Sequence, residues 1–532
     1  IVTPQAARQE NNPHATAPGG PAPVFDTAEN CMPCHNNLIS PTGEDISIGS
    51  SWRASMMANA GRDPYWMAGI RRETMDHPSA VSVIEDECTV CHLPMARTTH
   101  VYGGGTGKAF EHLPVTEKNR PIDKLAHDGV SCTACHQMQN EKLGTRESFV
   151  GGYVIRGREG SGRPHIFGPF QLEKGQRTIM RSASNFEPER GDHIKQSEMC
   201  ATCHTLFTKA LDKNGKEIGE LSEQAMYLEW KHSAYEGEQR SCQSCHMPVV
   251  QQDTPIASVL GDPRPGFSRH TFVGGNFFML KMLNKFRDEL GVQALPHEME
   301  ASVQRTLVNL QQSTARLDLD QAELAGGRLS FNVNVTNLTG HKLPTAYPSR
   351  RAWLHVTVRD QGGRVVFESG AIGPNGAIAG NDNDADALKF EPHYTEIRRP
   401  DDVQIYESVM VDGEGVLTTG LLRGVRYVKD NRLLPRGFDK ATASNEVAVL
   451  GGAMQDADFL GGSDRVRYSV DLAGAQGPFR VDAELRFQVI AFRWAENLKQ
   501  YDAPEPRRFV GYYQSMSSVS SEPLAQATLS LR

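Results

Sequence analysis

Cys31-Met32-Pro33-Cys34-His35 is the first of five motifs with one pattern: two cysteines separated by two residues and followed at once by histidine. The other four read CTVCH at 88–92, CTACH at 132–136, CATCH at 200–204 and CQSCH at 242–246. All 10 cysteines of the chain fall in these motifs: Cys31, Cys34, Cys88, Cys91, Cys132, Cys135, Cys200, Cys203, Cys242 and Cys245. The histidines that follow them are His35, His92, His136, His204 and His246.

This spacing is that of a covalent attachment site for c-type haem. Each thiol forms a thioether with a vinyl group of the macrocycle, and the histidine binds the iron from the proximal side. Zinc ribbons, redox-active dithiols and disulfide frameworks also use paired cysteines, but none of them requires histidine after the second cysteine. Histidine is 18 of 532 residues, so five chance placements have odds on the order of one in ten million or less. The sequence therefore predicts five haem c cofactors.

The remaining composition limits where the protein works and what it binds. The formal net charge is −8, and haem propionates make the surface more acidic, which argues against nucleic acid or anionic lipid as partners. No apolar run is long enough to form a transmembrane segment. The chain begins at Ile1, so we expect that a signal peptide was removed. Haem is attached to CxxCH outside the cytoplasm, so we expect a periplasmic or extracellular protein whose partners are redox proteins or copies of itself.

The chain divides into three segments by pattern. Residues 1–30 are rich in Pro, Ala, Gly and Asn, which predicts an N-terminal arm. Residues 31–315 carry all five motifs at irregular intervals, and we expect a pentahaem cytochrome c domain, mostly irregular with short α-helices. Apolar residues repeat at helical spacing in two stretches of this segment. They are Met279, Leu283, Phe286 and Leu290, and then Met299, Val303, Leu307 and Leu310.

From about residue 320 the apolar period changes to two, which is typical of half-buried strands. Alternating runs begin at Leu329, Leu354, Val466 and Leu485, and turn signals such as Gly326-Gly327 separate them. Residues 316–532 are therefore predicted to form an all-β, immunoglobulin-like sandwich of antiparallel strands. This segment contains no cysteine, so it carries no haem of its own.

Five six-coordinate irons also need five distal ligands, and several histidines outside the motifs are candidates. His270 precedes two glycines in HTFVGG, which let the backbone approach a flat macrocycle closely. His193 and His127 lie shortly before Cys200 and Cys132, and such offsets can deliver a ligand to a neighbouring haem. The other candidates are His100 and His112, which follow the second motif, and His341 in NLTGHKLPTAYPSRR. For each, the alternative is a surface or hydrogen-bonded histidine.

A methionine is a further candidate. WRASMM, from Trp52 to Met57, resembles multihaem cytochromes in which W-x-x-S-x-H supplies a distal histidine, and Met57 stands at the corresponding position. Thioether ligation raises the reduction potential of a haem, and the alternative is ordinary packing. EWKHSAY at 229–235 resembles the same motif with Tyr235 in the ligand position and His232 nearby.

Longer phrases carry a family resemblance. DGVSCTACH, EMCATCHT, CQSCHMP and HTFVGGN resemble the multihaem cytochromes c related to hydroxylamine oxidoreductase and to tetrahaem electron carriers. GHKLPTAYPSRRAWLHVTV resembles the β domain that some of these cytochromes carry at the C-terminus. The resemblance covers most of the chain after residue 30 and implies closely spaced haems in stacked and perpendicular pairs.

The resemblance leaves three functions open. They are an electron conduit, a subunit of an extracellular cytochrome filament, and an oxidoreductase acting on a small nitrogen or sulfur compound at one open haem. All five motifs end in histidine, and the chain contains no G-x-S-x-G or H-E-x-x-H. The conduit, which is not an enzyme, is therefore the leading hypothesis.

Two further sites complete the predictions. Asp382, Asp384 and Asp386 alternate like the acids of a calcium loop, although the stretch lacks the glycine and the twelfth-position glutamate of an EF-hand. The alternatives are a Ca²⁺ site and a solvated acidic loop. His14 lies in the arm, and in a homopolymer it would supply a distal ligand to a neighbouring copy. The alternative is an arm that packs along its own chain.

Overall fold

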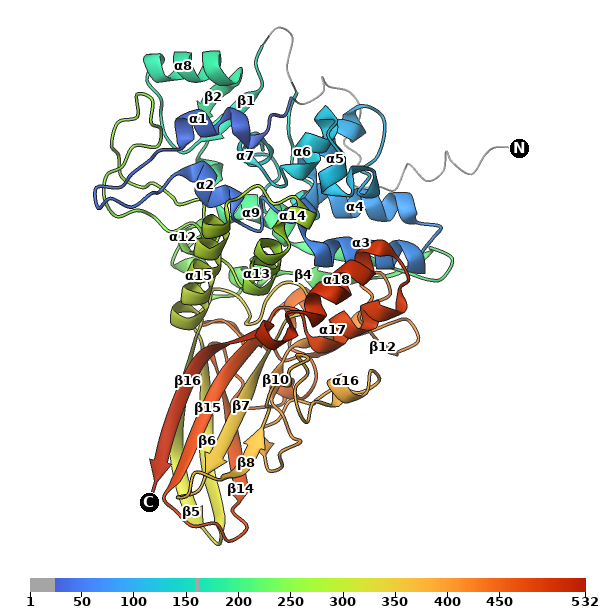
Figure 1. Cartoon of the computed structure of the whole chain (residues 1–532), viewed down its shortest axis with the longest axis vertical. Coiled ribbons are helices and arrows are strands. Elements are labelled where there is room, and N and C mark those ends of the chain that lie inside the picture. Colours follow the sequence, from blue (N-terminus) through green and yellow to red (C-terminus); the bar gives the residue numbers. More distant parts are fainter. Residues whose placement is uncertain (1–23, 158–161) are drawn as a thin grey trace.

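The computed structural model describes residues 24–157 and 162–532. The molecule is elongated, with the motif-bearing half at one end and the long strands at the other (Figure 1). None of the helices in these residues combines the length and the apolar character needed to cross a bilayer.

Each of the five motifs lies on a helix that ends at the motif's histidine. These helices are α1 (Met32–His35), α4 (Val81–His92), α7 (Cys132–His136), α9 (Ser197–His204) and α12 (Cys242–His246). Side chains at i, i+3 and i+4 share one face of a helix. The two cysteines and the histidine of each motif therefore point to the same side, as a single flat cofactor requires.

Ten further α-helices and four strands lie in the described part of the first 314 residues, besides short 3-10 helices. The helices are α2 (Ile48–Arg53), α3 (Pro64–Asp76), α5 (Pro94–Tyr102), α6 (Pro121–His127), α8 (Lys174–Ser184), α10 (Met226–Lys231), α11 (Ala234–Gly237), α13 (Phe277–Lys285), α14 (Arg287–Leu290) and α15 (Pro296–Ser313). The strands are β1 (His165–Gly168), β2 (Glu187–Arg190), β3 (Leu206–Leu211) and β4 (Glu217–Gln224). The prediction of short helices holds for α1, α7 and α12 but is wrong for α15, which has 18 residues. The two predicted apolar helical stretches correspond to α13 with α14 and to α15.

The C-terminal half is built on two larger sheets. One has the strand order β10 (Ile405–Tyr406), β7 (Arg351–Arg359), β15 (Phe479–Gln488) and β16 (Ser521–Leu531), with β8 (Val365–Ser369) also paired to β7. The other has the order β5 (Ala315–Ala325), β6 (Arg328–Asn337), β14 (Ser463–Asp471) and β9 (Glu396–Ile397). A smaller sheet joins β12 (Leu417–Thr418), β11 (Ser408–Val411) and β13 (Arg426–Asp430).

The predicted period of two is confirmed in the long strands. Phe331 on β6 pairs with Tyr468 on β14, and their rings stack with centroids 5.3 Å apart. Phe367 on β8 of the other sheet contacts the same tyrosine at 6.2 Å, so side chains of the two sheets meet in one core. The pairing is antiparallel except between β9 and β14, which run parallel.

The sequence had predicted an all-β segment here, but this half also contains helices. It contains α16 (Asp382–Ala385), α17 (Phe492–Glu496) and α18 (Pro504–Gln514). Phe509 of α18 packs against Tyr65 of α3 with ring centroids 4.9 Å apart, and Figure 1 shows the two helices side by side. An apolar period of two indicates strands only. It therefore could not predict α18, which packs against the motif-bearing half.

The two halves share one apolar core. The largest cluster of buried side chains contains Phe278 and Leu283 of α13, Val303 of α15 and the inward residues of β6, β7, β14 and β15. Such continuous apolar burial is the dominant favourable term in holding two layers together. The segment 31–315 therefore does not enclose a separate core that ends at residue 315.

Candidate functional site

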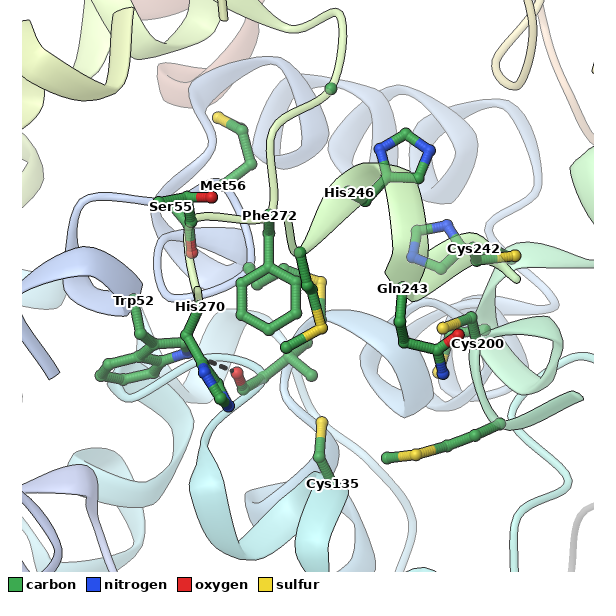
Figure 2. A pocket seen from close by; sticks show the side chains of 18 of the residues that line it. Trp52, Ser55, Met56, Cys135, Cys200, Cys242, Gln243, His246, His270 and Phe272 are labelled. Carbon is green, nitrogen blue, oxygen red and sulfur yellow. Dashed lines mark hydrogen bonds between the residues drawn. The ribbon is translucent and has the colours of Figure 1, made fainter. Parts of the chain in front are cut away.

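One cavity of about 1120 Å³ runs through the motif-bearing half. All ten cysteines and all five motif histidines line it. Figure 2 shows Cys135, Cys200 and Cys242 together with the His246 and His270 rings around this space. Motifs that lie up to 211 positions apart in the chain, from Cys31 to Cys242, therefore face one interior volume.

Hydrogen bonds fix which nitrogen four of the five motif histidines turn to the cavity. Nδ1 donates to a backbone carbonyl in His35 (Ile256, 2.7 Å), His92 (Ala60, 3.0 Å), His136 (Phe167, 2.6 Å) and His246 (Val273, 2.5 Å). A carbonyl only accepts, so Nδ1 carries the single hydrogen of the neutral ring and Nε2 keeps a free lone pair. This is the arrangement of metal-binding histidines, whose second nitrogen is held by an outer hydrogen bond.

Burial favours the neutral form of four motif histidines. It lowers the pKa of His92 and of His204 to about 4 and also lowers the pKa of His35 and His136. A protonated imidazole has no lone pair for a metal. The side chains are therefore ready to bind iron at neutral pH, and the residues fit five haem c groups.

Two histidines outside the motifs reach the same cavity. His270 lies opposite His136 with ring centroids 6.4 Å apart, and His341 lies opposite His246 at 6.2 Å. Metal–imidazole bonds of ~2.0–2.1 Å place two rings that share one ion roughly 6 Å apart. Both rings also hold Nδ1 on a backbone carbonyl, of Ser268 and Lys342 respectively. Burial lowers the pKa of His270 to about 3 and lowers that of His341.

The other candidate histidines are not brought to the cavity. Nε2 of His127 donates to the carbonyl of His112 (2.8 Å), and Nε2 of His193 donates to that of Met138 (2.9 Å). His112 donates from Nδ1 to Asp123 (2.7 Å) and lies against His100, with ring centroids 5.6 Å apart. Among the described histidines, only the five motif residues, His270 and His341 line the cavity.

The two tryptophan motifs support haem attachment segments. Trp52 donates from Nε1 to the carbonyl of Val130, and Trp230 donates to that of Arg240. Each acceptor stands two residues before the first cysteine of a motif. The Tyr235 hydroxyl donates to the Leu338 carbonyl (2.7 Å), which ties it to the loop of His341 and not to a metal.

Met57 and His232 occupy different environments. Met57 lines the cavity, and its backbone carbonyl accepts from Val130 N (3.0 Å). Both ring nitrogens of His232 are engaged, Nδ1 with the Leu228 carbonyl and Nε2 with Ser444 N. His232 is therefore not available as a ligand, whereas the Met57 thioether remains a candidate.

Glu229 is a positioning residue that the sequence did not single out. It is fully buried on α10 and accepts from Lys342 N (3.1 Å) and the Thr345 hydroxyl (2.5 Å), and it pairs with Arg432 (2.9 Å). These bonds hold the loop that carries His341 against the motif-bearing half. A lone glutamate before a tryptophan carries no local signal for such a role, because its partners lie more than 100 residues away.

One carboxylate of the predicted calcium site is already paired within the protein. Asp384 gives both carboxylate oxygens to Arg351 at 2.9 Å, and Asp386 accepts from Leu388 N (3.0 Å). Within the described residues, the group with metal-ligand spacing is instead His393, Asp456 and Asp464. His393 Nδ1 accepts there from the Gln404 and Asn431 amides, so Nε2 carries the hydrogen and donates to Asp456. Hydrogen bonding accounts for this cluster without a metal.

His14 lies outside the described residues. The described end of the arm packs on its own chain: Ala28 N donates to Asp128 (2.8 Å), and Asp26 exchanges hydrogen bonds with Thr133. Residues 24–30 therefore lie against the third motif.

Packing and hydrogen bonds show which motifs adjoin. Met32 of the first motif and Cys132 of the third pack against one apolar cluster. Cys91 of the second motif, Cys203 of the fourth and Met138, two residues after the third, share another cluster. Cys242 N of the fifth motif donates to the Ser197 hydroxyl (3.1 Å), at the start of the helix that carries the fourth motif. The fourth motif therefore adjoins the second, third and fifth, and the first adjoins the third.

One end of the cavity is polar. Asp63, Tyr65, Glu73, Glu223 and Tyr347 line it there. Burial raises the pKa of Asp63 to about 6 and that of Glu223 from its usual value near 4.5 to about 7. Buried carboxyls are therefore partly neutral near neutral pH at this end.

The pKa of Glu223 predicts a pH-dependent stability. Because the folded-state pKa is above the unfolded one, this carboxyl stabilises the fold fully below about pH 4.5, and the contribution is lost as the pH rises through about 7. Glu223→Gln should therefore match the parent at pH 4.5 and become more stable than it by pH 8. Thermal midpoints of both proteins across this range measure the difference, and parallel curves would contradict the assignment.

No protein-family model and no curated protein matches the chain. Among solved structures, it is similar to a penta-heme cytochrome c552 from Thermochromatium tepidum, with 15% sequence identity and a TM-score of 0.49. The alignment covers 95% of this chain and 99% of that one.

Proposed function

We propose that the chain binds five haem c groups covalently and transfers electrons through them between partner proteins outside the cytoplasm. The observation that carries the proposal is the convergence of ten cysteines and five motif histidines on one cavity. Haem c supplies reversible one-electron chemistry at iron, and the protein sets its axial ligands and surroundings.

In this proposal His35, His92, His136, His204 and His246 are the proximal ligands. His270 and His341 are distal ligands, opposite His136 and His246, because their spacing and free Nε2 atoms suit a shared iron. Met57 is a candidate distal ligand for one of the remaining haems. The C-terminal segment, which we propose to be an immunoglobulin-like β-sandwich, has a role in cofactor binding because it carries His341.

The order of the motifs supports a branched electron path. The fourth motif adjoins three others through packing and a hydrogen bond, and the first motif is reached through the third. In such a path the fourth site distributes electrons, while the first, second and fifth are ends at which partners exchange them.

A count of covalent haem tests the proposal. The exported full chain should carry five haems by pyridine haemochrome assay and intact mass. Cys242→Ala with Cys245→Ala should carry four, because both thioethers of one site are removed. Ser241→Ala and Ser244→Ala, which alter neighbouring positions and leave the thiols intact, are the matched control and should carry five. A parent chain that binds no haem after export would refute the proposal.

The polar end of the cavity favours a second candidate, an oxidoreductase acting at one open haem. No imidazole lies opposite His204 among the described residues, and Tyr65 and Tyr347 contribute polar groups to the cavity wall. Such an enzyme should show a high-spin ferric haem that binds cyanide rapidly. A fully low-spin ferric spectrum, unchanged by cyanide, would leave only the electron carrier.

A further inference from the structure

Arg350 is a half-buried cation beside the cavity. It lies just before β7, lines the cavity wall and donates from Nη1 to the Thr345 carbonyl (3.0 Å). Burial lowers the pKa of Arg350 to about 10, so the guanidinium remains charged at neutral pH. A guanidinium has five N–H donors in a planar fork. Among the described residues, only the Thr345 carbonyl accepts a hydrogen bond from that of Arg350.

The protein gives Arg350 no counter-ion. Within the described residues no carboxylate forms an ion pair with it, and Asp63 acts on it only through space. The Asp63 carboxylate is occupied at the start of α3, where it accepts from Tyr65 N (2.8 Å) and Trp66 N (3.2 Å). Asp63 thus caps a helix and does not neutralise the arginine.

Two other arginines of this half, both buried, do have carboxylate partners. Arg351 makes two bonds of 2.9 Å to Asp384, and Arg432 pairs with Asp430 (2.7 Å) and Glu229 (2.9 Å). Successive residues of extended chain point to opposite sides, which directs Arg351 into the β half and Arg350 to the cavity. An isolated buried charge is strongly unfavourable unless an opposite charge meets it. The missing partner must therefore come from what occupies the cavity.

We propose that Arg350 binds a planar, anionic pair of oxygens within the cavity, and that this group is the propionate carboxylate of a haem beside His204. The guanidinium fork matches a carboxylate in two parallel hydrogen bonds. Arg350 lines the cavity together with His204 and His341, and its positive charge lowers the pKa of both rings. Arg350 would thus be a positioning residue. Because a fixed positive charge near iron favours the ferrous state, it would also raise the potential of that haem.

The inference rests on haem binding as proposed above, so haem content is measured first in each protein. Arg350→Gln removes the charge, Arg350→Lys keeps the charge but loses the fork, and Arg398→Gln is the charge-matched control. Arg398 is exposed and pairs with Glu396 far from the cavity lining. A parent chain without haem would refute the proposed function, whereas five haems in every variant isolate the role of Arg350.

Spectroelectrochemical titration of the loaded full-length proteins then provides the readout. Arg350→Gln should raise the oxidised-to-reduced ratio of one haem at least tenfold at fixed potential, a shift of about 59 mV for a one-electron couple. Arg350→Lys should show less than half of that shift, and Arg398→Gln none. If Arg350→Gln loses one haem, Arg350→Lys still reports whether the charge matters. Titration curves of both Arg350 variants that overlay the parent curve would overturn the proposal.

Added anions test whether the oxygen pair that Arg350 binds belongs to a haem propionate or to a free anion. If a propionate occupies Arg350, millimolar acetate or nitrate leaves the parent titration unchanged. A saturable shift caused by acetate or nitrate in the parent, and absent from Arg350→Gln, would retain Arg350 as an anion site but overturn the assignment to a propionate.

Discussion

If the chain binds five haems as proposed, His341→Ala should convert one of them from low-spin to high-spin, although residue 341 lies 95 positions beyond the last motif histidine, His246. His341 lies opposite His246 with ring centroids 6.2 Å apart, and its Nδ1 is held by the Lys342 carbonyl. Without this imidazole the iron bound by His246 has no ligand on that side. Ferric electron paramagnetic resonance should detect the new high-spin signal.

Replacement by methionine makes a sharper test. His341→Met should keep the haem low-spin and raise its potential by at least about 0.1 V, a fraction of the ~0.8 V range that axial ligands cover.

His270→Ala should affect a different haem, so the double variant His270→Ala, His341→Ala should show two high-spin haems. His355→Ala, at a half-exposed position on β7 where the ring bonds to Glu368, is the control. Five low-spin haems in His341→Ala would exclude this residue as a ligand.

Arg351→Ala should destabilise the C-terminal half by about 3–5 kcal/mol, because it leaves the buried carboxylate of Asp384 without its partner. The pair is almost completely inaccessible to solvent, with side chains 2% and 3% exposed, and both of its bonds measure 2.9 Å. Asp384 also accepts from Ile378 N (2.7 Å). Denaturant unfolding followed by tryptophan fluorescence measures the loss.

The same substitution at the surface supplies the comparison. Arg398 pairs with Glu396 at 2.6 Å, but its side chain is 66% exposed. Arg398→Ala should therefore cost much less stability than Arg351→Ala, because solvent screens an exposed ion pair. The double variant Arg351→Ala, Asp384→Ala should recover part of the stability lost in Arg351→Ala, because no unpaired charge remains. Equal effects at positions 351 and 398 would show that the buried pair is not what stabilises this region.

Local patterns accounted for the elements of the fold but not for how its halves join. The alternation at Leu329, Phe331, Val333 and Val335 predicted β6, because a strand with one buried face must repeat every two residues. The helical spacing at Met299, Val303 and Leu310 predicted α15. No period marked α18 as the helix that would pack on α3, since that contact joins residues more than 400 positions apart.

The sequence by itself predicted the attachment chemistry. The spacing of two cysteines and a histidine is a covalent requirement, and on a helix it places all three side chains on one face. The tertiary structure alone decided which other histidines approach the cavity. His270 and His341 face it with free Nε2 atoms. His127 and His193 instead donate hydrogen bonds from Nε2 to backbone carbonyls. Asp384 likewise binds Arg351 and not a cation. In each case the partner is not adjacent in the sequence. Only the folded structure therefore shows which group accepts the histidine hydrogen or pairs with the carboxylate.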